Sequence, residues 1–413
     1  MKKTTVFYGW RIVFACFILM ACMIPPVVTM ASKFLIPITT EFNISKSSFT
    51  LSNTILQTMG IFLSPIISKN LSNGKLKKHL VFSIIGYSIS FASYGLVTNI
   101  YMHYVISFVL GVFYLNVGTI PVSILINNWF EYKKGVAMSL AMAGTGIGGF
   151  LFSPLSTSLL ENFGWRKTYL IIGVIVFLTA MLTTTLFIKE KPEDIGLEKL
   201  TKDNTIDNVP IVDKGIWDDF KSYKKKIFVW LILIGMLLNG IVHSGSVGQF
   251  PAAFEIKYGA IVGSLAVSIY SIVGVFGKMI MGILNDKKGV IYSIIFGTAG
   301  FSLAFILLMS TSSNEGLYLL SVFYGLGMGL GAVVPPLLIG AIFKGENYSV
   351  AYGYVNSMMQ AGMSLGAMFV SMLADKFNTY TVAWFILLVF TIVACVLWIL
   401  GYQKSKSYWT KHL

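Results

Sequence analysis

Residues 127–160 read NNWFEYKKGVAMSLAMAGTGIGGFLFSPLSTSLL. From Gly135 to Leu160 there is no charged residue, and these 26 residues exceed the roughly 20 that a helix needs to cross the hydrocarbon core of a bilayer. Gly144 and Gly148 lie four residues apart, a spacing that lets a neighbouring helix approach closely. The stretch therefore predicts a transmembrane helix that begins beside the basic pair Lys133-Lys134.

Eleven further apolar stretches accompany this one, and most of them approach or exceed the length of a membrane span. Six of the twelve precede a polar, Lys-rich segment at residues 189–226, and six follow it. We expect spans at 10–38, 48–68, 79–98, 101–127, 135–160, 165–188, 227–254, 261–285, 289–310, 316–342, 347–373 and 379–402.

The composition supports a polytopic membrane protein. The chain is 55% hydrophobic and 12% charged, with a mean hydropathy of +0.76, whereas a soluble protein of 413 residues needs a far more polar surface. The net charge of +14 does not indicate nucleic-acid binding, because the basic residues lie in short segments between spans. The three cysteines, Cys16, Cys22 and Cys395, fall within spans and suggest neither disulfides nor a metal site.

The distribution of basic residues predicts the orientation. With the N-terminus inside, 24 of the 31 Lys and Arg residues fall in inner segments and five in outer segments. This asymmetry follows the positive-inside rule, so we expect both termini in the cytoplasm. The two remaining basic residues, Lys33 and Lys278, lie within predicted spans.

Weak internal similarity predicts two pseudo-symmetric halves. Gly111 and Pro121 of the fourth span recur as Gly325 and Pro335 of the tenth, both 214 residues later. The fifth-span glycines Gly144 and Gly148 are echoed in the eleventh span by Gly362 and Gly366. We therefore expect an all-α membrane protein of twelve transmembrane helices, with a substrate site near the midplane between repeated halves. The expected parts are an N-terminal six-helix half (1–188), a cytoplasmic linker (189–226), a C-terminal six-helix half (227–402) and a cytoplasmic tail (403–413).

The charges inside the spans point to the class of substrate. Lys33 and Lys278 are both cations, and the twelve predicted spans contain no Asp or Glu. A charge near the centre of the bilayer costs about 2.5–3.5 kcal/mol on insertion scales, so such residues face polar cavities or partners. Two cations without a carboxylate in the spans favour an anionic substrate by charge compensation. Lysines that extend along the helix to the interface are the alternative, above all for Lys33, which lies nearer the outer side.

Several motifs resemble the major facilitator superfamily, and within it the branch of monocarboxylate transporters and bacterial oxalate/formate antiporters. The quoted segment 127–154 is similar to the signature of the fourth and fifth spans in that family. The other similar motifs are Tyr8-Gly9-Trp10-Arg11, Gly164-Trp165-Arg166, Pro192-Glu193-Asp194-Ile195-Gly196 and the loop from Gly282 to Gly289, GILNDKKG. The resemblance implies the major facilitator fold, the cell membrane (a bacterial inner membrane) and a monomer as the working unit.

The resemblance also implies roles for individual residues. Lys278 matches the eighth-span Arg that binds the substrate carboxylate, and Lys33 matches a first-span Lys that contacts substrate or acts in gating. Asp286, with Gly282 and Gly289, matches the inner gating loop. This chain departs from the family in three ways: Lys replaces the bidentate Arg, the loop after the second span lacks an Asp, and Gly274 stands where proton-coupled members have an Asp.

Uncharged polar residues complete the expected site. Neutral hydrogen-bonding groups beside an apolar wall suit a small organic acid, although each alone is more readily explained by a hydrogen bond between helices. They are Tyr114, Asn116, Tyr324, Asn356 and Gln360. Tyr324 and Asn116 are preferred because the resembled family places substrate contacts in their spans. His243, near the middle of the seventh span, is taken as the one histidine inside the membrane, either a proton carrier or a packing residue.

The sequence thus predicts a secondary transporter of a small organic anion, such as a monocarboxylate or an oxalate-like dicarboxylate. Proton symport and anion exchange remain open, so protons or a counter-anion are the expected partners beside the substrate and the lipid bilayer. An exporter of drugs or amphipathic metabolites is the alternative, and a sensor on a transporter scaffold would need a large soluble domain. We expect no enzyme activity, cofactor or metal, since the sequence has neither a phosphate-binding glycine loop followed by Lys-Ser/Thr nor a His/Glu cluster.

Overall fold

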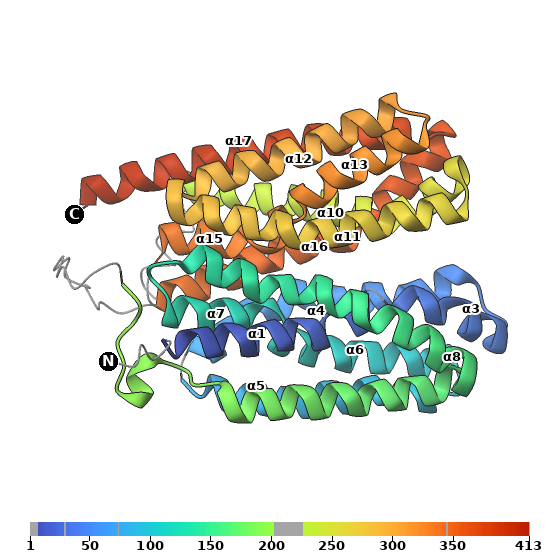
Figure 1. The fold of residues 1–413 in the computed structure, drawn as a ribbon, viewed down its shortest axis with the longest axis horizontal. Coiled ribbons are helices and arrows are strands. Elements are labelled where there is room, and N and C mark those ends of the chain that lie inside the picture. The colour runs from blue at the N-terminus through green and yellow to red at the C-terminus, as the bar shows by residue number, and fades with distance from the viewer. Residues whose placement is uncertain (1–6, 29, 73, 202–225, 344–345, 413) are drawn as a thin grey trace, which may run out of the picture. The chain divides into compact units, whose positions relative to one another are not determined.

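The computed structural model describes residues 7–28, 30–72, 74–201, 226–343 and 346–412. These residues are helical apart from their connections and one isolated β-bridge between Phe130 and Leu200 (Figure 1). The expected all-α fold class is confirmed. Most of the predicted linker lies outside the described residues, so its conformation stays a prediction.

The chain divides into two compact units. The first consists of Met1–Glu131 and Leu140–Leu200, and the second of Tyr132–Ser139 and Thr201–Leu413. The short segment Tyr132–Ser139 therefore belongs with the second unit, although it opens a helix that continues in the first.

The first unit contains the first six predicted spans. Its helices are α1 (Gly9–Met23), α2 (Pro25–Val28), α3 (Ala31–Phe42), α4 (Lys46–Ser72), α5 (Leu76–Ser93), η1 (Tyr94–Leu96), α6 (Ile100–Val117), α7 (Thr119–Trp129), α8 (Lys134–Phe187, from Leu140 onward) and η2 (Pro192–Ile195).

Two spans of this unit are broken where the sequence carries Pro or Gly. The first span breaks before Pro25, which lacks the N–H that would continue the helix. The fourth span breaks at Gly118, two residues before Ile120-Pro121. A third interruption lies in α8 at Gly164, whose φ of 72° and ψ of 170° favour glycine. In Figure 1 the ribbon of α8 turns back at its far end, so α8 contains both the fifth and the sixth predicted span.

The second unit contains the last six predicted spans. Its helices are α10 (Ile227–Tyr258), α11 (Ala260–Lys288), α12 (Val290–Ser310), α13 (Asn314–Gly327), α14 (Gly329–Ala332), α15 (Val334–Ile342), α16 (Glu346–Phe377) and α17 (Thr381–His412). α10 packs most extensively against α16 and α17, and α13 packs between α11 and α12. Figure 1 shows α12 and α17 running side by side.

The helix lengths agree with a polytopic membrane protein. Among the described residues, nine helices are long and apolar enough to cross a membrane, or ten if the bent pair Asn314–Ala332 and Val334–Ile342 forms one span. This count takes α8 as one helix although α8 holds two predicted spans. It also leaves out α4, which is more polar and corresponds to the second predicted span. The helices therefore account for the twelve predicted stretches.

The same glycine packing recurs in both units. In the first unit, a Cβ added to Gly144 or Gly148 of α8 would overlap the backbone of α1 at Phe17 or Ala21. In the second unit, a Cβ added to Gly362 or Gly366 of α16 would overlap the backbone of α10 at Leu237 or Ile241. Each glycine pair thus lets the fifth helix of a half lie directly against the first helix of that half.

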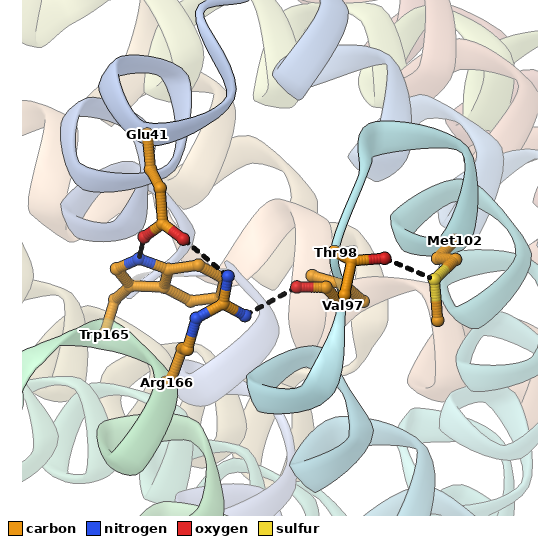
Figure 2. Close-up of polar contacts among 6 residues, drawn as sticks. All are labelled: Glu41, Val97, Thr98, Met102, Trp165 and Arg166. Atoms are coloured by element: carbon orange, nitrogen blue, oxygen red, sulfur yellow. Dashed lines mark hydrogen bonds and ion pairs between the residues drawn. The ribbon is translucent and has the colours of Figure 1, made fainter.

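Arg166 joins three segments at one end of the first unit (Figure 2). Its guanidinium donates to the backbone oxygen of Val97 and to Oε1 of Glu41, each at 2.5 Å, while Trp165 Nε1 donates to Glu41 Oε2 at 2.6 Å. The guanidinium also lies 4.2 Å from the centroid of the Trp165 ring. An exposed ion pair alone contributes little to stability, but this cluster fixes the link before α6 to the end of α3 and to the part of α8 that follows the interruption at Gly164.

A carboxylate from beyond the sixth span caps α5. Glu190 accepts hydrogen bonds from the backbone N–H groups of Lys75 and Lys77, at 3.0 and 2.9 Å. These N–H groups have no partner inside the helix, and the helix N-terminus favours a negative charge. The loop after the second span lacks an Asp, and Glu190 supplies a carboxylate beside it.

We expect Glu190→Ala to loosen the start of α5 by about 1–2 kcal/mol, because two charge-assisted hydrogen bonds are lost. Limited trypsin digestion should then cut faster at Lys75, Lys77 and Lys78. Glu193→Ala removes the same charge from an exposed neighbour and should leave digestion unchanged. Equal digestion of Glu190→Ala and wild type would contradict this capping role.

Candidate functional site

The tenth span is broken at a glycine-rich segment. Residues 325–332 read GLGMGLGA, α13 ends at Gly327, and α15 begins at Val334 and is bent by 41° from the preceding pair of helices. Pro335 and Pro336 follow at the start of α15 and prevent regular continuation of the helix. Such a break leaves backbone groups outside the regular hydrogen-bond ladder, which in membrane proteins occurs where the backbone is buried or lines a cavity.

Lys278 lies beside this break. It is carried by α11 and is only 6% exposed. A Cβ added to Gly329 would lie 3.4 Å from the Cα of Lys278. A Cβ added to Gly277 of α11 would lie only 2.6 Å from the backbone oxygen of Leu326, so glycines on both helices bring the lysine backbone against the broken span.

His243 and Asn239 of α10 contact the same break. A Cβ added to Gly331 would lie 3.3 Å from Nδ1 of His243, and Asn239 Nδ2 donates to the backbone oxygen of Leu330 at 3.4 Å. The backbone of Lys278 and the side chains of His243 and Asn239 therefore lie next to Gly329–Ala332, all within the second unit.

Tyr324 lies at the end of α13 in an aromatic cluster. It is fully buried, and its hydroxyl forms a 2.6 Å hydrogen bond with Ser246 Oγ. Its ring stacks on Phe301 with a centroid distance of 4.7 Å and meets Phe250 edge-on at 4.7 Å. The structure therefore gives Tyr324 a packing environment and a protein partner, while its predicted contact with substrate stays a prediction.

The two predicted residues of the eleventh span lie one turn apart. Asn356 and Gln360 of α16 are both 8% exposed, and their spacing of four places them on one face of the helix. α16 packs closely against α10, the helix that carries His243. Their predicted role in substrate binding stays a prediction.

The predicted residues of the first unit lie on α3 and α6. Lys33 Nζ donates to the backbone oxygen of Ser153 at 2.5 Å and to Thr157 Oγ1 at 2.6 Å, so it links α3 to α8. Asn116 Nδ2 donates to the backbone oxygen of Val112 in its own helix at 2.8 Å. Tyr114 lies on the same helix and is partly exposed. The roles of Lys33, Asn116 and Tyr114 in binding substrate stay predictions.

The predicted gating loop forms a helix cap within the second unit. Asp286 accepts hydrogen bonds from the backbone N–H groups of Gly135 and Val136, at 2.6 and 2.8 Å. These groups open α8, where the helix dipole favours a carboxylate. Gly282 packs directly on Gly135, and Gly289 ends α11 with a φ of 96°. The gating role of Asp286, Gly282 and Gly289 stays a prediction.

Sequence analysis missed three residues. Asn239 and Ser246 were not considered, although polar residues in an apolar run such as Leu237-Leu238-Asn239 are the signal that could have found Asn239. The statement that His243 is the one histidine inside the membrane was wrong. His103 lies in the first turn of α6 and is 2% exposed, because Phe49 and Tyr94 from other segments pack over its ring.

The polar groups around the helix break can bind a small anion. A buried ammonium is a strong donor to carboxylate, and neighbouring imidazole and amide groups add hydrogen bonds. Among the described residues there is no group of three or more His, Cys, Asp or Glu that could hold a metal ion.

Comparisons with known proteins agree with this architecture. The profile of the Major Facilitator Superfamily matches residues 12–263 and 250–411. Monocarboxylate transporter 12-B of Danio rerio is 24% identical over 412 residues, covering 92% of this chain and 84% of the relative. Monocarboxylate transporter 4 of Mus musculus is 22% identical over 395 residues, covering 90% and 78%.

Solved structures show the same fold. The proton:xylose symporter XylE, bound to 6-bromo-6-deoxy-D-glucose, superposes with a TM-score of 0.73 at 15% identity, covering 94% of both chains. At this identity the likeness concerns the fold alone. The family match extends over nearly the whole chain, and the relatives are transporters and not enzymes. The chain therefore belongs to the Major Facilitator Superfamily and is a multi-pass membrane transporter that resembles the monocarboxylate transporter branch.

Proposed function

We propose that this protein is a secondary active transporter of a small organic anion, either a monocarboxylate such as lactate or formate or an oxalate-like dicarboxylate. The observation that carries the proposal is Lys278, a cation that is 6% exposed and lies against the break in the tenth span. The names of the relatives at 22–24% identity add support for the substrate class.

The energy of the buried charge favours an anionic ligand. An ammonium in a membrane span costs about 2.5–3.5 kcal/mol on insertion scales. The predicted spans of the second half contain no Asp or Glu, so a substrate carboxylate is the natural compensating charge. Lys278 offers a point charge to one carboxylate oxygen, while Asn239 and His243 are placed to add hydrogen bonds.

Transport would follow alternating access, with the site opening to one side of the membrane at a time. In this proposal, the carboxylate of Asp286 at the start of α8 holds one of the alternating states, and its release accompanies the change to the other. We further place the protein in the cell membrane, as a monomer, with both termini in the cytoplasm, as the distribution of Lys and Arg indicates.

His243 is our candidate for coupling transport to protons. It lies beside Gly331 of the break that Lys278 also contacts, and an imidazole can bind and release a proton near neutral pH. We expect His243→Gln to reduce gradient-driven carboxylate uptake to the level seen without a pH gradient, while exchange against an internal anion continues. His79→Gln, at the start of α5, is the matched control. Gradient-driven uptake by His243→Gln at the wild-type level would contradict a role of His243 in proton coupling.

The substrate class can be tested by binding to the purified protein. Thermal stability should rise with lactate, formate or oxalate, because a ligand bound to the folded state stabilises it. The amides of the same acids, which lack the charge, and amphipathic cations should give no shift. Stabilisation by cations or neutral amphipathic compounds and not by carboxylates would instead favour an exporter of drugs or metabolites.

A further inference from the structure

A small cavity lies in the first unit, apart from the residues of the proposed substrate site. Its volume is about 40 Å³, and α2, α3, α4, α5, η1, α6 and α8 all contribute to its wall. The lining includes Phe49, Ser52, Asn53, Tyr94, His103 and Tyr169. A cavity needs roughly 10–15 Å³ to hold one water, so this one has room for a small cluster of waters.

His103 brings two buried ring nitrogens to this wall. Its side chain is 2% exposed, and neither Nδ1 nor Nε2 has a hydrogen-bond partner among the described residues. A neutral imidazole carries one N–H donor and one acceptor. Buried polar groups in native proteins are nearly always bonded to protein or to ordered water, so the ring requires a polar molecule from the cavity.

Aromatic side chains enclose the imidazole ring. It stacks on Tyr94 with centroids 4.1 Å apart, and Phe49 lies 5.3 Å away at a tilted angle. The hydroxyl of Tyr94 is engaged with Ser107 Oγ at 2.7 Å, so it is not free to turn toward the ring. The geometry therefore holds His103 in place and leaves water as the available partner for its nitrogens.

The charged groups of the surrounding elements do not compensate a charge on His103. Among the described residues, the titratable groups that line the cavity with it are Tyr94 and Tyr169, and this lining contains no Asp, Glu, Lys or Arg. At the same end of the unit, Glu41 of α3 and Arg166 of α8 bind each other and Trp165 or Val97 (Figure 2). A proton on His103 would therefore rely on water and on the aromatic faces, which attract a cation only modestly.

We propose that His103 and this cavity form a hydrated proton-binding site in the first unit, separate from Lys278 and His243. Neutral His103 is compatible with the closed aromatic wall, whereas the protonated ring has two donors to satisfy and a charge to hydrate. Protonation should therefore favour a looser packing of α4 and α6 around the cavity. The site makes the first unit sensitive to acid, whatever the substrate of the transporter is.

The test compares purified full-length wild type with His103→Gln, which keeps a donor and an acceptor but cannot titrate. As the pH falls from about 8 to about 4, the melting temperature of the wild type should drop by at least roughly 5 °C more than that of His103→Gln. His79→Gln, at an exposed position of α5, should follow the wild type. His103→Asn gives a second non-titrating variant if the longer amide does not fit the aromatic wall.

A spectroscopic readout identifies the group directly. In protein labelled with ¹³C at histidine Cε1, one resonance that is absent from His103→Gln should shift reversibly over the pH range in which stability falls. The proposal is overturned if that resonance keeps its neutral position throughout the range. It is also overturned if wild type and His103→Gln lose stability equally on acidification. Loss of carboxylate transport would not by itself bear on this result, because both readouts are taken without substrate.

Discussion

Replacing Lys278 with alanine should lower carboxylate uptake roughly 30-fold or more, because truncating one partner of a buried charge pair costs about 2–5 kcal/mol. Lys278 is 6% exposed, so water cannot readily substitute for the missing ammonium. The loss should appear as a higher KM, and also as a lower maximal rate if the lysine binds the anion more strongly during translocation than in the resting state. Uptake into proteoliposomes at several substrate concentrations separates the two.

Two further substitutions make the result specific to charge. Lys278→Gln keeps much of the side-chain length without the charge and should fail as Lys278→Ala does. Lys278→Arg keeps the charge in a planar, bidentate form and should retain transport in part. Elution of each variant as a single species in size-exclusion chromatography shows that it is folded. Wild-type uptake by Lys278→Gln would contradict the proposed role of the ammonium.

Replacing Gly148 or Gly366 with leucine should prevent correct folding. In both cases the added Cβ would overlap a backbone segment, that of Ala21 in the first unit or that of Ile241 in the second. A backbone atom cannot move away as the end of a flexible side chain can, so we expect a cost of about 3 kcal/mol or more for each substitution. The measurement is the amount of folded, monodisperse protein recovered after extraction from the membrane.

Controls for this prediction lie on the outer faces of the same helices. Leu151→Phe in α8 and Met368→Phe in α16 add volume at positions that are 58% and 64% exposed, and they should leave recovery unchanged. The two glycine substitutions should be similar in effect, because the same packing recurs in the two units. Normal recovery of either glycine variant would show that the repeated packing does not govern folding of that half.

The spans and the repeated packing could be predicted from sequence because both depend on local properties. An uncharged run longer than about 20 residues can be recognised without knowing its neighbours. The 214-residue offset between Gly111 and Gly325 also had a structural cause. Gly111 packs on the backbone oxygen of Leu56 and Gly325 on that of Tyr270, and these two partners are separated by the same 214 residues.

Contacts between distant segments could not be predicted in the same way. Glu190 caps α5 across more than 110 residues, and a pattern of apolar residues carries no information about such a pair. Tyr324 was chosen because it is a polar residue in a span, but its bond to Ser246 depends on how α10 and α13 pack. His103 was overlooked because its burial is produced by Phe49 and Tyr94, which belong to other segments.

The candidate site was predicted in part. The intramembrane charge of Lys278 and the histidine of the seventh span were found from sequence, and the structure brings both to the break in the tenth span. Asn239 was missed because an amide in a helix is usually a packing residue. The link between Lys33 and the Ser153–Thr157 turn could not be foreseen, since it joins two spans far apart in the chain.

The most direct test of the central claim is uptake of labelled lactate, formate and oxalate into proteoliposomes that contain the wild-type protein, with protein-free vesicles as the baseline. The account predicts saturable uptake of at least one carboxylate. Uptake driven by an inward proton gradient would indicate symport, and uptake that requires an internal counter-anion would indicate exchange. Uptake of all three anions at the baseline level under both conditions would contradict it.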